Sequence, residues 1–106
     1  MQSPTDRRIE LHHKLEALIG SEEVHFQPPS NIQMRYPCIV YERSNNHTRF
    51  ANDHLYRNTR RYTLTVIDKN PDTALPDKVL ASMQYVSLNR VFTYENLNHY
   101  VFDIYY

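Results

Sequence analysis

Apolar and polar residues alternate most clearly in the last seventeen residues of the chain. Every second position near the end is apolar or aromatic, which is typical of a strand with two unlike faces. These positions are Tyr100, Phe102, Ile104 and Tyr106. The pattern predicts a β-hairpin with strands at 90–94 and 98–105 and a turn at 95–97. We expect one face of the second strand to lie in the core and the other to face a partner.

A different spacing near the start predicts an amphipathic helix. Ser3 supplies a capping hydroxyl, Pro4 suits the first turn, and Asp6 places a negative charge near the positive end of the helix dipole. Apolar residues then recur at helical intervals, at Leu11, Leu15, Leu18 and Ile19. Gly20 follows where a left-handed terminating residue is expected, so the helix should end just before it.

Three further runs predict strands. A short one at 24–27 ends at a pair of prolines, and a β-branched run at 36–42 begins through Pro37. The clearest is 61–68, where one face carries the apolar residues of an alternating pattern. That face holds Tyr62, Leu64 and Val66, and the opposite face holds Thr63, Thr65 and Ile67.

A second helix is expected after the chain break at 70–72. It should run from Thr73 or Leu75 to about Tyr85, with Leu75, Val79, Leu80 and Met83 as its apolar residues. The order α-β-β-β-α-β-β predicts one α+β domain over 1–106, a mostly antiparallel sheet of about five strands with both helices on one face. The other face keeps residues that suit a protein interface: Thr63, Thr65, Val101 and Tyr105.

Composition narrows the classes of function. The 12 basic and 12 acidic residues cancel, which gives no global field for nucleic acid or an anionic membrane. The chain has one glycine, whereas phosphate-binding loops and nucleophile elbows require several. A single cysteine, Cys38, rules out an internal disulfide and favours a cytosolic protein. No apolar run approaches the ~18 residues of a membrane span.

Candidate catalytic or metal-binding residues are weak. The six histidines are scattered, and His12 and His13 are neighbours that point about 100° apart on a helix, unlike a chelating pair. Cys38 lies in an apolar strand, where a buried and unreactive thiol is expected. Asp103 stands between aromatics, and we interpret it as an edge-strand charge that prevents stray pairing. We therefore predict no enzyme activity, metal or cofactor.

A basic segment remains, within a long and flexible loop predicted at about 43–60. From 43 to 61, five arginines against one aspartate give 5 − 1 = +4, and aromatic residues lie between them. A solvated loop, a protein contact and nucleic-acid binding all fit this pattern. Together with the exposed sheet face, the interface candidates are Arg43, Arg49, Phe50, Tyr56, Arg57, Arg60, Thr63, Thr65, Val101, Asp103 and Tyr105.

Several segments, taken in order, resemble the small tail-completion, or tail-terminator, proteins of long-tailed bacteriophages. They are the amphipathic first helix, YPCIVY at 36–41, FAND at 50–53, RYTLTVIDKNP at 61–71, LPDKVL at 75–80 and FTYENL at 92–97. The likeness covers nearly the whole chain.

The resemblance implies a structural subunit without enzymatic activity or cofactor. Such subunits form a ring, typically a hexamer, that caps the tail tube, ends its growth and joins it to the head connector. The expected partners are other copies of the chain, the tail tube protein, the connector or stopper protein, and DNA passing through the lumen. The expected location is the virion at the head–tail interface, and the host cytoplasm during assembly. Alternatives are a head-completion component of the same phage and a small nucleic-acid-binding module that uses 43–61.

Overall fold

A computed structural model describes residues 3–44 and 60–106, and every structural statement below concerns this part of the chain. In chain order its elements are α1 (Pro4–Ile19), β1 (Val24–Phe26), β2 (Cys38–Arg43), β3 (Arg61–Asp68), α2 (Leu75–Ser82), β4 (Tyr85–Tyr94) and β5 (Leu97–Tyr105). The predicted α+β class and the predicted order of helices and strands are both confirmed.

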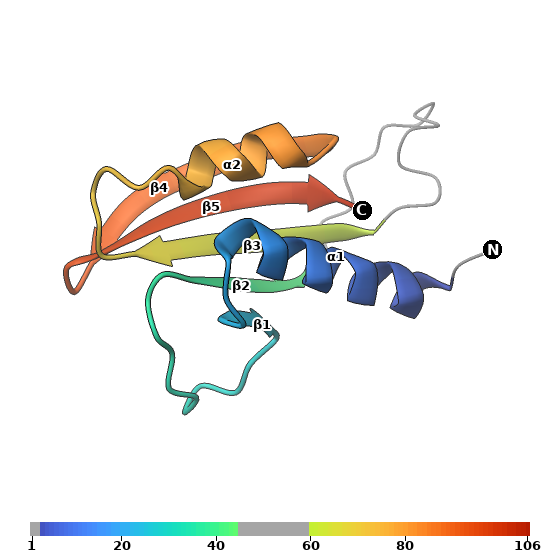
Figure 1. Cartoon of the computed structure of the whole chain (residues 1–106), viewed down its shortest axis with the longest axis horizontal. Helices are drawn as coiled ribbons and strands as arrows, with labels where there is room; N and C mark the ends of the chain where they lie inside the picture. The colour runs from blue at the N-terminus through green and yellow to red at the C-terminus, as the bar shows by residue number, and fades with distance from the viewer. Residues whose placement is uncertain (1–2, 45–59) are drawn as a thin grey trace.

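The strands form one sheet in the order β1-β2-β3-β5-β4. The β1–β2 pair is parallel and the other three pairs are antiparallel. Both helices lie on the same face of the sheet (Figure 1), as predicted. The last strand, β5, therefore lies inside the sheet between β3 and β4, and the two edges are β1 and β4.

Local sequence signals define α1 at both ends. The backbone N–H of Asp6 donates to the Ser3 hydroxyl at 3.1 Å, and the Asp6 carboxylate accepts from the Ser3 N–H at 3.3 Å. This reciprocal pair satisfies two of the amides that a helix start leaves without partners. At the other end Gly20 takes a left-handed conformation with φ of 75° and donates to the Glu16 carbonyl at 2.8 Å. The predicted caps are confirmed.

The core lies between the helices and the sheet face that they cover. Leu11 and Leu15 of α1 are fully buried, as are the residues that β2, β3 and β5 direct to that face. The strand residues are Ile39, Tyr41, Tyr62, Leu64, Val66, Phe102 and Ile104. The alternation of buried and half-buried residues along β3 matches the predicted faces, and burial of such side chains contributes about 1.5–3 kcal/mol each.

The second helix and the fourth strand meet at a different point from the one predicted. The helix ends at Ser82 rather than near Tyr85, because Met83 already has extended backbone angles, with φ −102° and ψ 142°. Tyr85 instead begins β4 opposite Tyr105, so this strand is five residues longer at its start than the predicted 90–94. Of the apolar residues named for this helix, Leu75, Val79 and Met83 are buried and Leu80 is exposed.

Other predicted boundaries move by one or two residues. The first strand ends at Phe26 because Gln27 has a positive φ of 46°. The second begins at Cys38 and continues through Arg43, which shortens the predicted loop at its start. Glu95 and Asn96 alone form the turn between β4 and β5, with φ of 51° and 64°. Two consecutive positive φ values are the requirement of a tight hairpin turn.

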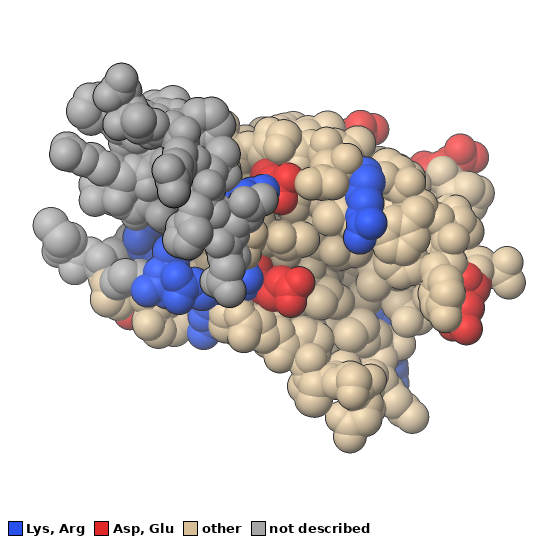
Figure 2. All heavy atoms as spheres, turned by 180° about the vertical axis from the view of Figure 1, so that it is seen from behind, with Lys and Arg blue, Asp and Glu red and all other residues tan. Residues whose placement is uncertain are grey.

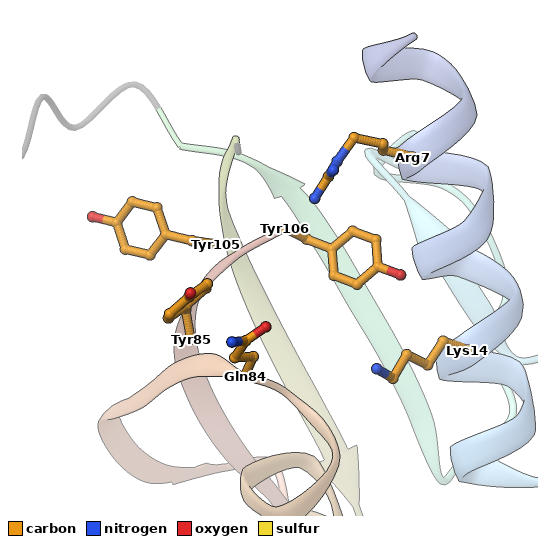
Figure 3. A pocket seen from close by; sticks show the side chains of 6 residues that line it. All are labelled: Arg7, Lys14, Gln84, Tyr85, Tyr105 and Tyr106. Atoms are coloured by element: carbon orange, nitrogen blue, oxygen red, sulfur yellow. The ribbon is translucent and has the colours of Figure 1, made fainter. Parts of the chain in front are cut away.

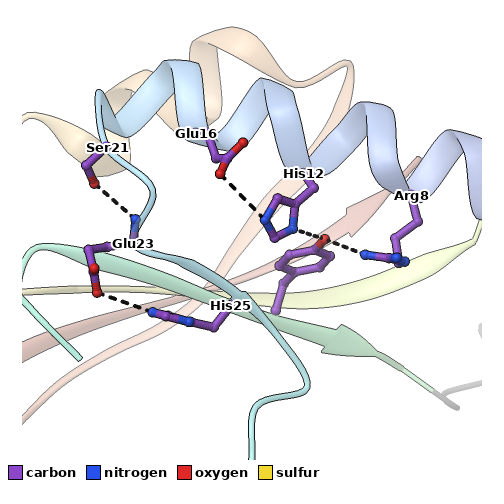
Figure 4. Close-up of polar contacts among 7 residues, drawn as sticks. Arg8, His12, Glu16, Ser21, Glu23 and His25 are labelled. Atoms are coloured by element: carbon purple, nitrogen blue, oxygen red, sulfur yellow. Dashed lines mark hydrogen bonds and ion pairs between the residues drawn. The ribbon is translucent and has the colours of Figure 1, made fainter. Parts of the chain in front are cut away.

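The buried Tyr41 of β2 connects the sheet to half-buried polar side chains of α1, among them Arg8 and His12 (Figure 4). Its ring lies 4.9 Å from the ring of Phe26, and its hydroxyl lies 2.7 Å from Nδ1 of His12 and 3.3 Å from Nη1 of Arg8. Burial raises the pKa of Tyr41, so the hydroxyl keeps its proton and can donate it to His12. The other nitrogen of His12, Nε2, lies 3.9 Å from the Glu16 carboxylate.

Candidate functional site

The predicted loop candidates divide between described and undescribed parts of the chain. Four of them lie outside the described residues, namely Arg49, Phe50, Tyr56 and Arg57. Arg43 is exposed at the end of β2. Arg60 exchanges two backbone hydrogen bonds with Tyr106, at 2.9 and 3.1 Å, which extends the β3–β5 ladder by one pair.

The remaining candidates come together on the sheet face away from the helices. Thr65 of β3 lies opposite Val101 of β5, and Thr63 lies opposite Asp103. The prediction that Val101 is left for a partner is wrong, because only 7% of its surface is exposed. It lies between Thr65 on one side and Arg90 on the other, within the chain's own sheet. Thr63, Thr65 and Tyr105 are half-buried.

Asp103 has a different role from the one predicted. The interpretation as an edge-strand charge is wrong, because β5 is an interior strand. One carboxylate oxygen lies 3.1 Å from the Arg61 guanidinium, and the other accepts a hydrogen bond of 2.8 Å from the Asn89 amide. Asp103 therefore joins β3, β5 and β4 across the face opposite the helices, and its charge is balanced within the chain.

This face carries its charge unevenly. Figure 2 shows the molecule from behind, with basic side chains gathered toward one end and uncharged residues over most of the remaining visible surface. Arg43 ends β2 and Arg61 begins β3, so both belong to one end of the sheet. Basic residues at the end of a half-apolar face suit a protein contact more than a continuous nucleic-acid track, which needs cations along its length.

The most exposed apolar surface of the described residues lies on β4, of which the sequence pattern predicts only the part at 90–94. Its residues from Ser87 to Tyr94 are all exposed. Leu88 is 44% exposed, Val91 53% and Tyr94 63%. The apolar residues Val86 and Leu88 alternate as in a strand and could have indicated the start of β4. They were not assigned to a strand because they lie immediately after the predicted end of the second helix. A ten-residue strand with one paired side presents its other backbone groups to a partner strand.

An irregularity in β4 determines which side chains face which way. Leu88 pairs with Phe102 and Arg90 with Val101, so Asn89 is an extra residue without a partner in the ladder. This β-bulge shifts the alternation by one position. As a result Val91 rather than Arg90 lies on the helix-covered face, and Phe92 lies on the other face.

Beyond the bulge, Phe92 is held in place by its neighbours. Its ring stacks on that of His99 with centroids 4.6 Å apart and planes 9° from parallel. The Arg90 guanidinium lies 5.1 Å from the Phe92 centroid, within the range of a cation–π contact. Arginine and aromatic residues that are fixed and partly exposed are frequent anchors of protein interfaces.

Within the described residues, neither the cysteine nor the histidine and acidic side chains form an arrangement suited to catalysis or metal binding. Burial raises the pKa of the Cys38 thiol to about 12, which keeps it protonated and unreactive at neutral pH. No cluster of three histidine, cysteine or acidic side chains suited to a metal occurs within 3–44 and 60–106. Neither described helix has the length and apolar character that a membrane crossing requires.

Comparisons with known proteins do not assign the chain to a family. No protein-family model matches the chain, and neither the curated proteins nor the solved structures contain a match. The candidate site is accordingly defined by geometry: the exposed edge strand β4, and the half-buried face formed by Thr63, Thr65, Asp103 and Tyr105.

Proposed function

We propose that the protein is a structural subunit of a phage tail, a tail-completion protein whose copies form a ring on the end of the tail tube. The observation that carries the proposal is β4, an edge strand of ten residues with an exposed outer side. Such an edge is a liability in a monomer and a ready contact in an assembly. The sequence likeness described above indicates the kind of assembly.

The exposed part of β4 has the composition of an interface on both of its faces. Between Ser87 and Tyr94, Leu88 and Val91 are exposed on the helix-covered face. Tyr94 is exposed on the opposite face, together with the one charged residue of this stretch, Arg90. Exposed apolar area of this kind favours association because its removal from water contributes about 25 cal/mol per Å². The low charge also permits close approach of a second chain.

The mechanism in this proposal is geometric. A ring of these subunits would match the last ring of the tube on one face and present a different surface on the other. Because the second surface does not resemble the tube, tube subunits could not add to it, and growth would stop. The same surface would then receive the head connector. Rigid packing of helices on the sheet suits this role, since the ring must hold its shape against both partners.

The test is to purify the chain and measure its mass by light scattering and its shape by negative-stain electron microscopy, alone and with tail tubes. We expect rings, free or at one end of each tube, and tubes that no longer elongate when tube protein is added. A protein that is monomeric in solution and fails to bind tubes would contradict the proposal.

A parallel incubation with isolated heads separates the two structural alternatives. A tail-completion protein binds tubes before it joins them to heads. Binding to heads or connectors with no affinity for tubes would identify a head-completion protein instead. Binding to duplex DNA that weakens steeply with added salt, without binding to either structure, would support the nucleic-acid alternative.

A further inference from the structure

A pocket of about 260 Å³ opens between α1, the residues before β4 and the end of β5. Figure 3 shows Arg7 and Lys14 reaching toward it from α1, with the ring of Tyr106 between them. The lining residues are Arg7, Lys14, Gln84, Tyr85, Tyr105 and Tyr106, which together define the Arg7–Lys14 pocket. The helix places both cations on one face because they stand seven residues apart, close to two turns.

Within residues 3–44 and 60–106, no ion pair neutralises the cations of this pocket. The ion pairs among described residues involve neither Arg7 nor Lys14. Both instead lie over the Tyr106 ring, at 5.5 Å for the Arg7 guanidinium and 5.8 Å for the Lys14 ammonium. Nε of Arg7 is buried and has no hydrogen-bond acceptor in the described part of the chain. An unpaired buried donor is costly, so an incoming anion would be favoured.

Tyr106 engages the nearby carboxylate of the same chain, which leaves the pocket to an anion from another molecule. Its hydroxyl donates to the Glu10 carboxylate at 2.8 Å, and Glu10 is not among the residues that line the pocket. Burial, together with Glu10, raises the pKa of Tyr106 to about 12, so the phenol stays neutral. A planar carboxylate suits the guanidinium of Arg7, which can bind both oxygens, and the amide of Gln84 offers a further donor.

A matching carboxylate lies at the opposite end of the molecule. Glu95 stands at the tip of the β4–β5 turn, is exposed, and makes no ion pair within the described residues. Figure 1 shows this turn at one end of the long axis, with the end of β5 and the start of α1 at the other. The molecule extends 41 Å along that axis. The two features therefore cannot meet within one chain but can meet between chains arranged head to tail.

We propose that the Arg7–Lys14 pocket receives the carboxylate of Glu95 from a second copy of the chain. The inference rests on the proposed function, because a closed ring requires a head-to-tail contact between two different surfaces of the same subunit. The contact between Glu95 and the Arg7–Lys14 pocket would be one such head-to-tail contact. Aromatic walls that exclude water would strengthen the attraction between the carboxylate and the two cations.

Charge reversal tests this contact in the full chain. Lys14→Glu and Glu95→Lys should each weaken self-association at least tenfold, since each places like charges together. The double variant restores opposite charges and should recover most of the loss. Matched controls are Lys78→Glu on α2 and Asp72→Lys in the loop before it, both exposed, and each should change association less than twofold. Sedimentation equilibrium at 0.1 M salt measures all five variants, with circular dichroism to confirm folding.

The outcomes separate this inference from the proposed function. If the wild type forms rings and the double variant does not recover, the contact is wrong while the ring proposal stands. If Lys14→Glu abolishes binding to a short DNA duplex but leaves association unchanged, the pocket takes a phosphate and the contact is also wrong. A wild type that is monomeric at all concentrations overturns the contact. The tube-binding experiment then decides the proposed function separately.

Discussion

The two edges of the sheet are built in opposite ways. At one edge, β1 has three residues, pairs in parallel with β2, and ends where Gln27 takes a positive φ before two prolines. The Gln27 side chain accepts a hydrogen bond from the Arg43 N–H at 3.2 Å, which continues the contact with β2 past the end of β1. At the other edge, β4 has ten residues, most of them exposed. One edge is short and ends in an irregular conformation, and the other is long and exposed.

Burial of side chains also differs between the two edges. Near β1, the ring of Tyr41 is fully buried between Phe26 and Tyr62, with centroid distances of 4.9 and 5.9 Å. On β4, only Tyr85 and Val86 are half-buried. We therefore expect substitutions near β1 to lower stability, and substitutions on the exposed part of β4 to leave stability nearly unchanged.

The largest difference in stability should appear when a tyrosine is replaced by alanine near β1 and, for comparison, on β4. Tyr41→Ala should cost about 3–5 kcal/mol of unfolding free energy, the range for large aromatic residues in a core. It also leaves His12 and Arg8 without their partner. Tyr94→Ala should change stability by no more than about 0.5 kcal/mol, because that side chain is exposed. Urea denaturation measures both, and similar losses at the two positions would refute the comparison.

The next effect should be on association alone. Leu88→Lys on the β4 edge should weaken self-association about 10- to 100-fold, equivalent to losing the burial of one leucine. Leu80→Lys is the matched control, since Leu80 is 42% exposed on α2 and Leu88 44% on β4. Light scattering over a concentration series measures both variants. Equal weakening would show that the partner contacts α2 as much as β4.

A smaller effect should appear at the turn that holds β4 in place. Asn96 has a φ of 64°, which asparagine tolerates and alanine does not. Asn96→Ala should therefore cost about 1 kcal/mol of unfolding free energy. Asn96→Gly is the control and should cost nothing, because glycine accepts this conformation freely. If both variants unfold at the same urea concentration as the wild type, the hairpin turn contributes little to keeping β4 attached.

The smallest effect should be a dependence of stability on pH on the β1 side. Burial lowers the pKa of His12 below its usual value of 6.5, although Glu16 acts in the opposite direction. The folded chain therefore binds fewer protons at this site than the unfolded chain. The stabilisation is complete above about pH 6.5 and is lost as the pH falls through the folded-state pKa.

The comparison of two glutamine variants isolates this contribution. Urea midpoints between pH 7.5 and 5 should fall more for the wild type than for His12→Gln, which has no proton to gain at this position. His13→Gln, at the exposed neighbouring residue, should follow the wild type. Parallel profiles for the wild type and His12→Gln would exclude His12 as the source.

Features set by neighbouring residues were predictable from the sequence. The caps of α1 depend on Ser3, Asp6 and Gly20, each of which acts within one turn of the helix. The faces of β3 follow from strict alternation. The junction of α2 and β4 was not predictable, because Met83 continues the helical spacing and no glycine or proline marks the end. Pairing of Tyr85 with Tyr105, twenty residues away, determines it.

The candidate site was predicted less completely than the fold. The alternation in β3 and β5 correctly separates Thr65, Val101 and Tyr105 from the core-facing residues. It could not show that β5 is interior, since strand order depends on contacts between distant segments. That order buries Val101, gives Asp103 its partners, and moves the exposed edge to β4. The contributions of Arg49, Phe50, Tyr56 and Arg57 remain predictions.

The bulge at Asn89 has a consequence for the behaviour of the chain in a crowded cell. A regular strand as long as β4 would be a template for indefinite stacking of copies, the route by which exposed edges lead to amyloid. The extra residue bends the strand, interrupts its hydrogen-bonding pattern and increases its twist. Deleting Asn89 would flatten the edge and restore an unbroken ladder. The irregularity at Asn89 therefore acts against indefinite edge-to-edge stacking of copies.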